Sequence, residues 1–144
     1  MAIGLATVLA CGDDGGNAPA PECLPELPRD CNIVWQNYDA IWDNAFSSCG
    51  SATTGGFCHG AEGQMAGLLM SDKDTAYDSL LGGNDGRARV IPGDPECSTL
   101  VQRIESEDAA FQMPPGGRMT APQRCSIIQW IAQGANRDDP PPSQ

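Results

Sequence analysis

The sequence predicts a small domain built from short helices, and two observations support this prediction. First, four segments carry apolar side chains at steps of three and four residues, a spacing that gathers them on one face of a helix. Second, these segments are bounded by residues that cap helices or end them. The chain has 17 glycines and 12 prolines among its 144 residues, so we expect short helices joined by irregular loops in one domain.

The first predicted helix runs from about Gln36 to Ser48. Apolar residues follow the helical spacing from just before this helix to its end, and they are Val34, Tyr38, Ile41, Trp42, Ala45 and Phe46. The end of this helix leads the chain directly to Cys49. We expect its aromatic side chains to pack in the core of the domain.

Three further helices follow. One is capped by Ser71 or Asp72 and ended by the Gly82-Gly83 pair. The next runs from about Glu96 to Glu105, with its apolar residues facing inward. The last occupies residues 120–134, where a threonine, a proline and a glutamine form the pattern of a helix start and a glycine forms the end.

The charge of the chain limits the partners that it can bind. It has 8 basic and 19 acidic side chains, which gives a formal net charge of -11. This charge disfavours binding to nucleic acid and to anionic lipid surfaces. We therefore expect no nucleic acid partner, and protein partners with basic or neutral docking surfaces.

The two ends of the chain differ in composition from its middle. Residues 1–11 form an apolar run that ends at Cys11 and resembles a bacterial lipobox, in which the cysteine is lipidated. We expect an exported protein, anchored by this lipid in the bacterial periplasm or on the cell surface. Residues 12–30 are rich in proline and glycine and are predicted to form a linker. The domain is expected at 31–137, followed by a disordered tail at 138–144.

Export changes the expected chemistry of the seven cysteines, because thiols in an oxidising compartment form disulfides or attachment points. Four of them, Cys23, Cys31, Cys97 and Cys125, are predicted to form two bridges. Four cysteines allow three pairings. Proximity in the sequence favours Cys23 with Cys31, which leaves Cys97 with Cys125.

The segment CGSATTGGFCHG begins at Cys49 and contains Cys58 and His59, the single histidine of the chain. A histidine directly after a cysteine that closes a short loop is typical of c-type haem attachment, in which two thiols bond the porphyrin and the imidazole binds the iron. The loop is irregular, because eight residues separate the cysteines instead of two. A simple Cys49–Cys58 disulfide is the alternative and leaves His59 unexplained. A zinc site of His59 and three cysteines has suitable ligand types, although oxidising export argues against it.

A second iron ligand and two residues for the haem propionates are also predicted. Met113 is followed by two prolines and two glycines, so a stiff non-helical loop can present its thioether to iron. Arg87 and Arg89 are suited to bind the two propionates, because a guanidinium binds a carboxylate at two points, although a solvated loop explains them equally well. The competing methionines lie in less stiff segments, and they are Met65, Met70 and Met119.

Six motifs follow in order: CHG, AGLLM, AYDSLLGG, RVIPGDPECSTLVQRI, MPPGG and CSIIQWIAQGA. Together they resemble the single-haem cytochrome c-like domains of exported bacterial proteins, particularly myxobacterial lipoproteins and planctomycete-type cytochromes, over roughly Tyr38 to Asn136. The resemblance implies an all-α fold of about four short helices around one covalently attached haem c. It makes Cys58 an attachment cysteine, His59 the proximal ligand and Met113 the distal ligand. Cys49 matches the other attachment cysteine through a longer loop.

These residues predict an electron carrier and not an enzyme, because iron bound by both His59 and Met113 has no open position for a substrate. A peroxidase-like enzyme would need Met113 to be absent from the iron. The alternative function is a haem-free, disulfide-stapled lipoprotein of the envelope that acts as an interaction module. It keeps every cysteine and has no use for His59.

Overall fold

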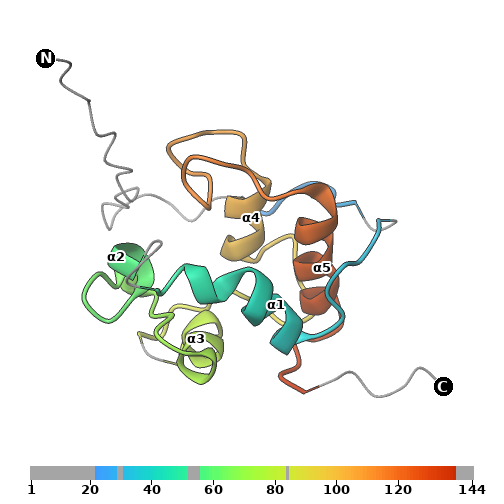
Figure 1. The fold of residues 1–144 in the computed structure, drawn as a ribbon. Helices are drawn as coiled ribbons and strands as arrows, with labels where there is room; N and C mark the ends of the chain where they lie inside the picture. The colour runs from blue at the N-terminus through green and yellow to red at the C-terminus, as the bar shows by residue number, and fades with distance from the viewer. Residues whose placement is uncertain (1–21, 29–30, 52–55, 84, 139–144) are drawn as a thin grey trace, which may run out of the picture.

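The structure is a computed structural model that describes residues 22–28, 31–51, 56–83 and 85–138 (Figure 1). All regular secondary structure in these residues is helical, which confirms the all-α class. The elements are α1 (Tyr38–Asn44), the 3-10 turn η1 (Phe46–Ser48), α2 (Gly56–His59), the 3-10 turn η2 (Met65–Gly67), α3 (Lys73–Leu80), α4 (Thr99–Glu105) and α5 (Ala121–Ala132). None of the helices described here has the length and apolarity that a bilayer crossing requires. The predicted lipidation at Cys11 and most of the predicted linker and tail lie outside the described residues.

Side chains at the helix starts explain where three helices begin. Asp72 and Asn37 each accept a hydrogen bond at 2.9 Å from the backbone N–H three residues further on, which caps α3 and α1. At the start of α5, the N–H of Thr120 donates to Oε1 of Gln123 at 2.9 Å. The sequence signals at Asp72 and Thr120 therefore mark real helix starts.

Two predicted helices are shorter in the structure. The helix expected at 36–48 is interrupted at Ala45, whose φ of -128° and ψ of -59° are not helical, and continues only as the turn η1. The helix expected at 96–105 begins three residues later, at α4. Asp94 accounts for the delay, because its Oδ1 accepts the N–H of Cys97 at 3.1 Å and holds this stretch in a turn.

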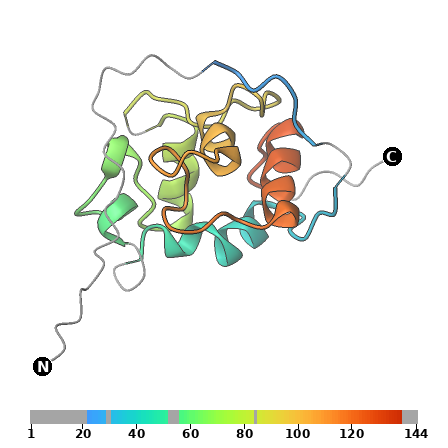
Figure 2. The same cartoon turned by 90° about the horizontal axis from the view of Figure 1, so that it is seen from above.

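Two views together show how the helices are arranged. In Figure 1, α1 runs across the molecule, with α2 and α3 towards one end and α5 at the other. Figure 2 shows the same separation from above, with α4 between the two ends. Helix α5 contacts both α1 and α4. The loop that joins α4 to α5 folds back over α4 in both views.

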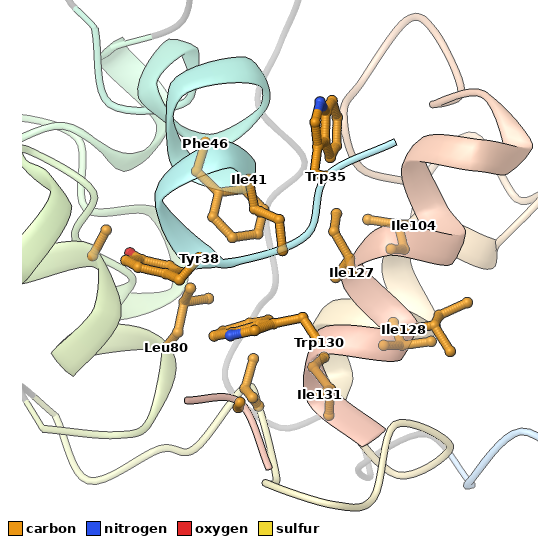
Figure 3. Packing of buried hydrophobic residues seen from close by; sticks show 14 of the residues in the cluster. Trp35, Tyr38, Ile41, Phe46, Leu80, Ile104, Ile127, Ile128, Trp130 and Ile131 are labelled. Carbon is orange, nitrogen blue, oxygen red and sulfur yellow. The ribbon is translucent and has the colours of Figure 1, made fainter. Parts of the chain in front are cut away.

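The core is centred on a stacked pair of aromatic rings (Figure 3). The rings of Tyr38 and Trp130 lie 5.3 Å apart at an angle of 28°, which joins α1 to α5. Their polar atoms are satisfied by backbone carbonyls: the Tyr38 hydroxyl donates to Lys73 at 2.9 Å and Trp130 Nε1 donates to Asn136 at 2.8 Å. The fully buried aliphatic residues around them are Ile41, Leu80, Val90, Val101, Ile127, Ile128 and Ile131.

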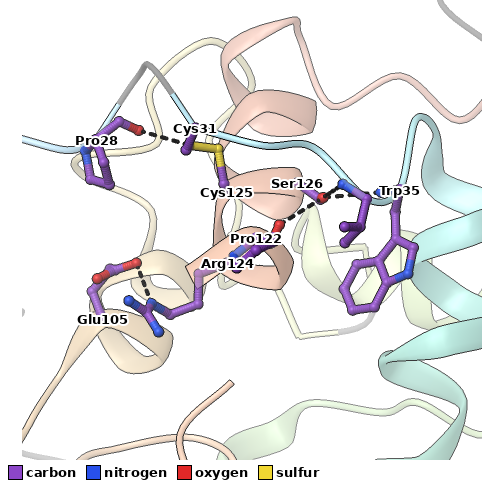
Figure 4. The surroundings of a disulfide bond; sticks show 9 residues. Pro28, Cys31, Trp35, Glu105, Pro122, Arg124, Cys125 and Ser126 are labelled. Atoms are coloured by element: carbon purple, nitrogen blue, oxygen red, sulfur yellow. Dashed lines mark hydrogen bonds and ion pairs between the residues drawn. A yellow bond between two sulfur atoms is a disulfide. The ribbon is translucent and has the colours of Figure 1, made fainter. Parts of the chain in front are cut away.

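An N-terminal arm, defined here as residues 22–28 and 31–35, lies against α4 and α5 instead of standing apart from the domain. Leu27 in the arm is buried in the core. Near α5, the Oγ of Ser126 accepts the backbone N–H groups of Val34 at 2.9 Å and of Trp35 at 3.1 Å (Figure 4). The described part of the predicted linker therefore packs on the domain.

Two disulfides fix this arm, and the pairing predicted from the sequence is wrong. Cys23 bonds Cys97 and Cys31 bonds Cys125, instead of Cys23 with Cys31 and Cys97 with Cys125. The bridges span 74 and 94 residues of sequence. Proximity in the sequence fails because the arm runs along the domain, where Cys23 meets the turn before α4 and Cys31 meets α5. Cross-links over such distances remove much of the entropy of the unfolded chain.

Candidate functional site

His59 is the last residue of the single-turn helix α2, and its side chain is partly buried. Its Nδ1 atom is buried without a hydrogen-bond partner. Burial is the main cause that lowers the pKa of His59, and the charges of Arg103 and Arg89 lower it further. Hydrogen bonding with the backbone of Leu68 and of Met65 raises this pKa but does not outweigh burial. The neutral imidazole, which is the form that binds metals, is therefore favoured. An unsatisfied buried nitrogen also fits a side chain that awaits a bound group.

The segments of Cys49 and His59, ten positions apart in the sequence, both contact the backbone of Met70. Gly50 packs against the backbone of Met70, where an added Cβ would lie 1.6 Å from the carbonyl oxygen. The N–H of Met70 in turn donates to the His59 carbonyl at 2.6 Å. Cys49 carries a free thiol that donates to the carbonyl of Ala45 at 3.7 Å, and burial raises its pKa. These contacts bring the first predicted attachment cysteine to the segment of the predicted iron ligand.

Cys58 precedes His59, and its sulfur is part of a disulfide. Because Cys49 carries a free thiol, the Cys49–Cys58 disulfide considered from the sequence is wrong. A thioether to a porphyrin would use the same sulfur atom, so the disulfide and the thioether exclude one another. The attachment role of Cys58 stays a prediction. The chemical state of this sulfur distinguishes the two functions considered below.

Met113 lies in the loop between α4 and α5, next to a cis peptide bond to Pro114, and its side chain is partly buried. Its N–H donates to the carbonyl of Arg103 at 3.1 Å. The guanidinium of Arg103 lies 4.3 Å from the centre of the Phe111 ring, and its Nη1 donates to the Phe111 carbonyl at 3.1 Å. The loop that the prolines predict to be stiff is therefore also bound to α4.

The far end of the same loop is held by ion pairs. Glu105, the last residue of α4, accepts from Arg124 Nε at 2.7 Å and from Arg118 Nη2 at 3.1 Å, and Figure 4 shows the first of these contacts. Arg118 also pairs with Glu107 at 3.2 Å. The sequence analysis missed these residues, because no spacing rule links an acid on one helix to arginines beyond a loop. The available signal was the gathering of three of the eight basic residues at positions 103, 118 and 124, around Met113.

The two arginines predicted for haem propionates lie around a carboxylate of the protein itself. Nη1 and Nη2 of the buried Arg89 donate to both oxygens of Asp85, at 2.7 and 2.6 Å, and to the carbonyls of Ser79, Arg87 and Ala66. Only its Nε remains for another acceptor. Arg87 is more exposed and contacts Asp85 through Nε at 3.1 Å. Hydrogen bonding from Arg89 is the main reason that the pKa of Asp85 lies far below its usual value.

Other candidate sites find less support in the described residues. Within them, no three or more histidine, cysteine, aspartate or glutamate side chains gather as a metal site would need, so the zinc hypothesis lacks a ligand set there. A polar surface depression contains none of the predicted site residues. It is lined by Asn37, Asp39, Lys73, Arg137 and Asp138.

A protein-family model matches part of the chain. No curated protein and no solved structure matches the chain significantly. The family model of the planctomycete cytochrome C proteins matches residues 56–117, a stretch that contains Cys58, His59 and Met113. This similarity, on an all-helical fold, supports a cytochrome c-like domain.

Proposed function

We propose that the protein is a c-type cytochrome that carries single electrons on one covalently attached haem, with His59 as proximal and Met113 as distal ligand. One observation carries the proposal. His59 has a buried Nδ1 without a partner and follows Cys58 in the stretch that matches the cytochrome family, which also contains Met113. Cys49 would be the second attachment cysteine, because its neighbour Gly50 packs on Met70, whose N–H donates to the His59 carbonyl.

The residues of the chain would hold this group and limit its reactivity. Bound haem c supplies the one-electron chemistry, because its iron changes between the ferric and ferrous states. His59 and Met113 would together hold the iron and leave it no open position for a substrate, which favours a carrier over an enzyme. A neutral thioether ligand and partial burial favour the ferrous form and raise the reduction potential. The net charge of -11 acts in the opposite direction.

The same proposal includes location and partners. A lipid at Cys11 would anchor the protein on the exported side of a bacterial membrane, in the periplasm or on the cell surface. Its redox partners would present basic or neutral surfaces to this acidic protein. Negative charge also argues against nucleic acid as a partner.

A second candidate function is a haem-free interaction module of the envelope. The disulfides favour it, because Cys23–Cys97 and Cys31–Cys125 staple the fold without any cofactor. The bridged sulfur of Cys58 favours it as well. The unsatisfied nitrogen of His59 has no role in such a module.

Expression of the chain with a cytochrome c maturation system separates the two functions. We expect a pyridine haemochrome spectrum of covalent haem and an intact mass larger by one haem. In the ferric protein, the weak long-wavelength band that marks thioether ligation should be present, absent in Met113→Ala and retained in the matched control Met119→Ala. A colourless protein with a third disulfide would establish the module instead.

The number of thioether bonds is measured with the same preparation. Cys49→Ala and Cys58→Ala are each analysed by intact mass after acid extraction of non-covalent haem. Haem retained by both single variants means that each cysteine forms a bond. Haem lost only in Cys58→Ala means that Cys49 is not an attachment point.

A further inference from the structure

Arg103 contacts the loop of Met113 in three ways. Its backbone carbonyl accepts the N–H of Met113 at 3.1 Å. Its Nη1 donates to the carbonyl of Phe111 at 3.1 Å, and its guanidinium lies 4.3 Å from the centre of the Phe111 ring. One residue of α4 therefore holds both ends of the short stretch 111–113, through its backbone and through its side chain.

The guanidinium of Arg103 places a positive charge beside the Met113 loop, because it donates to the Phe111 carbonyl and lies over the Phe111 ring. A charge at this position acts on a group that Met113 binds.

The other arginines of the loop have a different role. Arg118 and Arg124 both pair with Glu105, at 3.1 and 2.7 Å, and fix the chain after Met113. Their contacts reach residues 105, 107 and 119, whereas the contacts of Arg103 reach 111 and 113.

From this geometry we propose that Arg103 is a positioning residue of the redox site, which holds the loop so that the Met113 thioether stays on the iron and whose charge raises the reduction potential. The inference rests on the proposed function, because it needs a haem bound by Met113. The planar fork of arginine is suited to contact a carbonyl and an aromatic face at once. A positive charge near the iron favours the ferrous state, which carries one positive charge fewer.

The test uses the haem-loaded protein and the variants Arg103→Gln and Arg103→Lys. We measure the pH at which the ferric band of thioether ligation is lost, and the reduction potential. In Arg103→Gln the midpoint pH at which the band is lost should fall by about one unit, which corresponds to a tenfold smaller equilibrium constant for ligation by Met113. The reduction potential should also fall. Arg103→Lys keeps the positive charge but not the planar guanidinium. Its reduction potential should therefore equal that of the parent, while its band should be lost at the same lower pH as in Arg103→Gln.

Arg137→Gln is the matched control. Arg137 also lies over an aromatic ring, 5.6 Å from the centre of Tyr77, and pairs with Asp74; neither of these contacts in the described residues involves the Met113 loop. The control should lose the band at the same pH as the parent. If Arg103→Gln does not fold, Phe111→Ala removes the ring contact without a change of charge. It should lose the band at lower pH while the potential stays unchanged.

The outcomes separate this inference from the proposed function. A parent protein without covalent haem, or with haem but without the thioether band, overturns the proposed function and this inference with it. A parent with both, in which Arg103→Gln or Phe111→Ala behaves like Arg137→Gln, overturns the role of Arg103 alone.

Discussion

The α5 region and the His59 segment are stabilised in different ways. In α5, six of the 12 residues are buried, and a disulfide joins the helix to the N-terminal arm. In the stretch 58–70, by contrast, only Gly60 and Met70 are buried. That stretch is held by backbone hydrogen bonds, by a glycine contact and by the guanidinium of Arg89. The comparison shows that the unsatisfied nitrogen of His59 lies in a stretch with fewer buried residues than α5, where a large apolar cofactor would add burial.

The largest effect is expected when the cross-link of the α5 region is removed. The double variant Cys31→Ser, Cys125→Ser should lose about 4 kcal/mol of unfolding free energy, because the unfolded chain regains the entropy of a long closed loop. Urea denaturation of parent and variant measures the difference. A change within experimental error would contradict the view that cross-links stabilise this region.

The second-largest loss of unfolding free energy is expected at Gly50, which contacts the His59 segment. In Gly50→Ala, the new Cβ would lie 1.6 Å from the Met70 carbonyl oxygen, and the backbone must move to relieve the overlap. We expect a loss of about 3 kcal/mol in unfolding free energy, at the upper end for overpacking. Gly117→Ala is the control, because nothing lies within 4 Å of its Cβ position. Equal stability of the two variants would show that the Gly50–Met70 contact is not tight.

The ion pair between Arg89 and Asp85 should contribute less to the unfolding free energy, and its contribution should depend on pH. Asp85→Asn leaves the Arg89 guanidinium without its carboxylate, and we expect a loss of about 2 kcal/mol, below the value for fully buried pairs. The pKa of Asp85 is lowered in the folded state, so the pair stabilises the protein fully above its ordinary value of 3.8. The stabilisation is then lost as the pH falls through the folded-state pKa. Denaturation curves of parent and variant should therefore differ at neutral pH and converge in acid, and curves that stay parallel would contradict this assignment.

Features that depend on neighbouring residues could be predicted from the sequence. Asp72 and Thr120 mark helix starts, because capping acts over three positions. The Cys58-His59 pair is equally local. Arg89 was predicted to bind a haem propionate, which stays a prediction; the carboxylate that it binds in the structure is Asp85, four positions earlier, and this pair was not predicted.

Features that depend on how distant segments meet could not be predicted. The disulfide pairing follows from the course of the arm over α4 and α5, which no local pattern encodes. The contacts of Arg103 with Phe111 and Met113 require the loop to fold back over α4, and this return is set by packing. Sequence spacing therefore identified the candidate ligands but not the residue that holds one of them in place.

The two disulfides also determine how the protein would respond to a pulling force. Tension between Glu22 and Arg137 would pass along the arm from Cys23 to Cys31 and then through the bridge to Cys125, because this covalent route is the shortest. Cys49, His59 and Met113 all lie outside that route. Tension applied between Glu22 and Arg137 would thus place no mechanical load on Cys49, His59 or Met113.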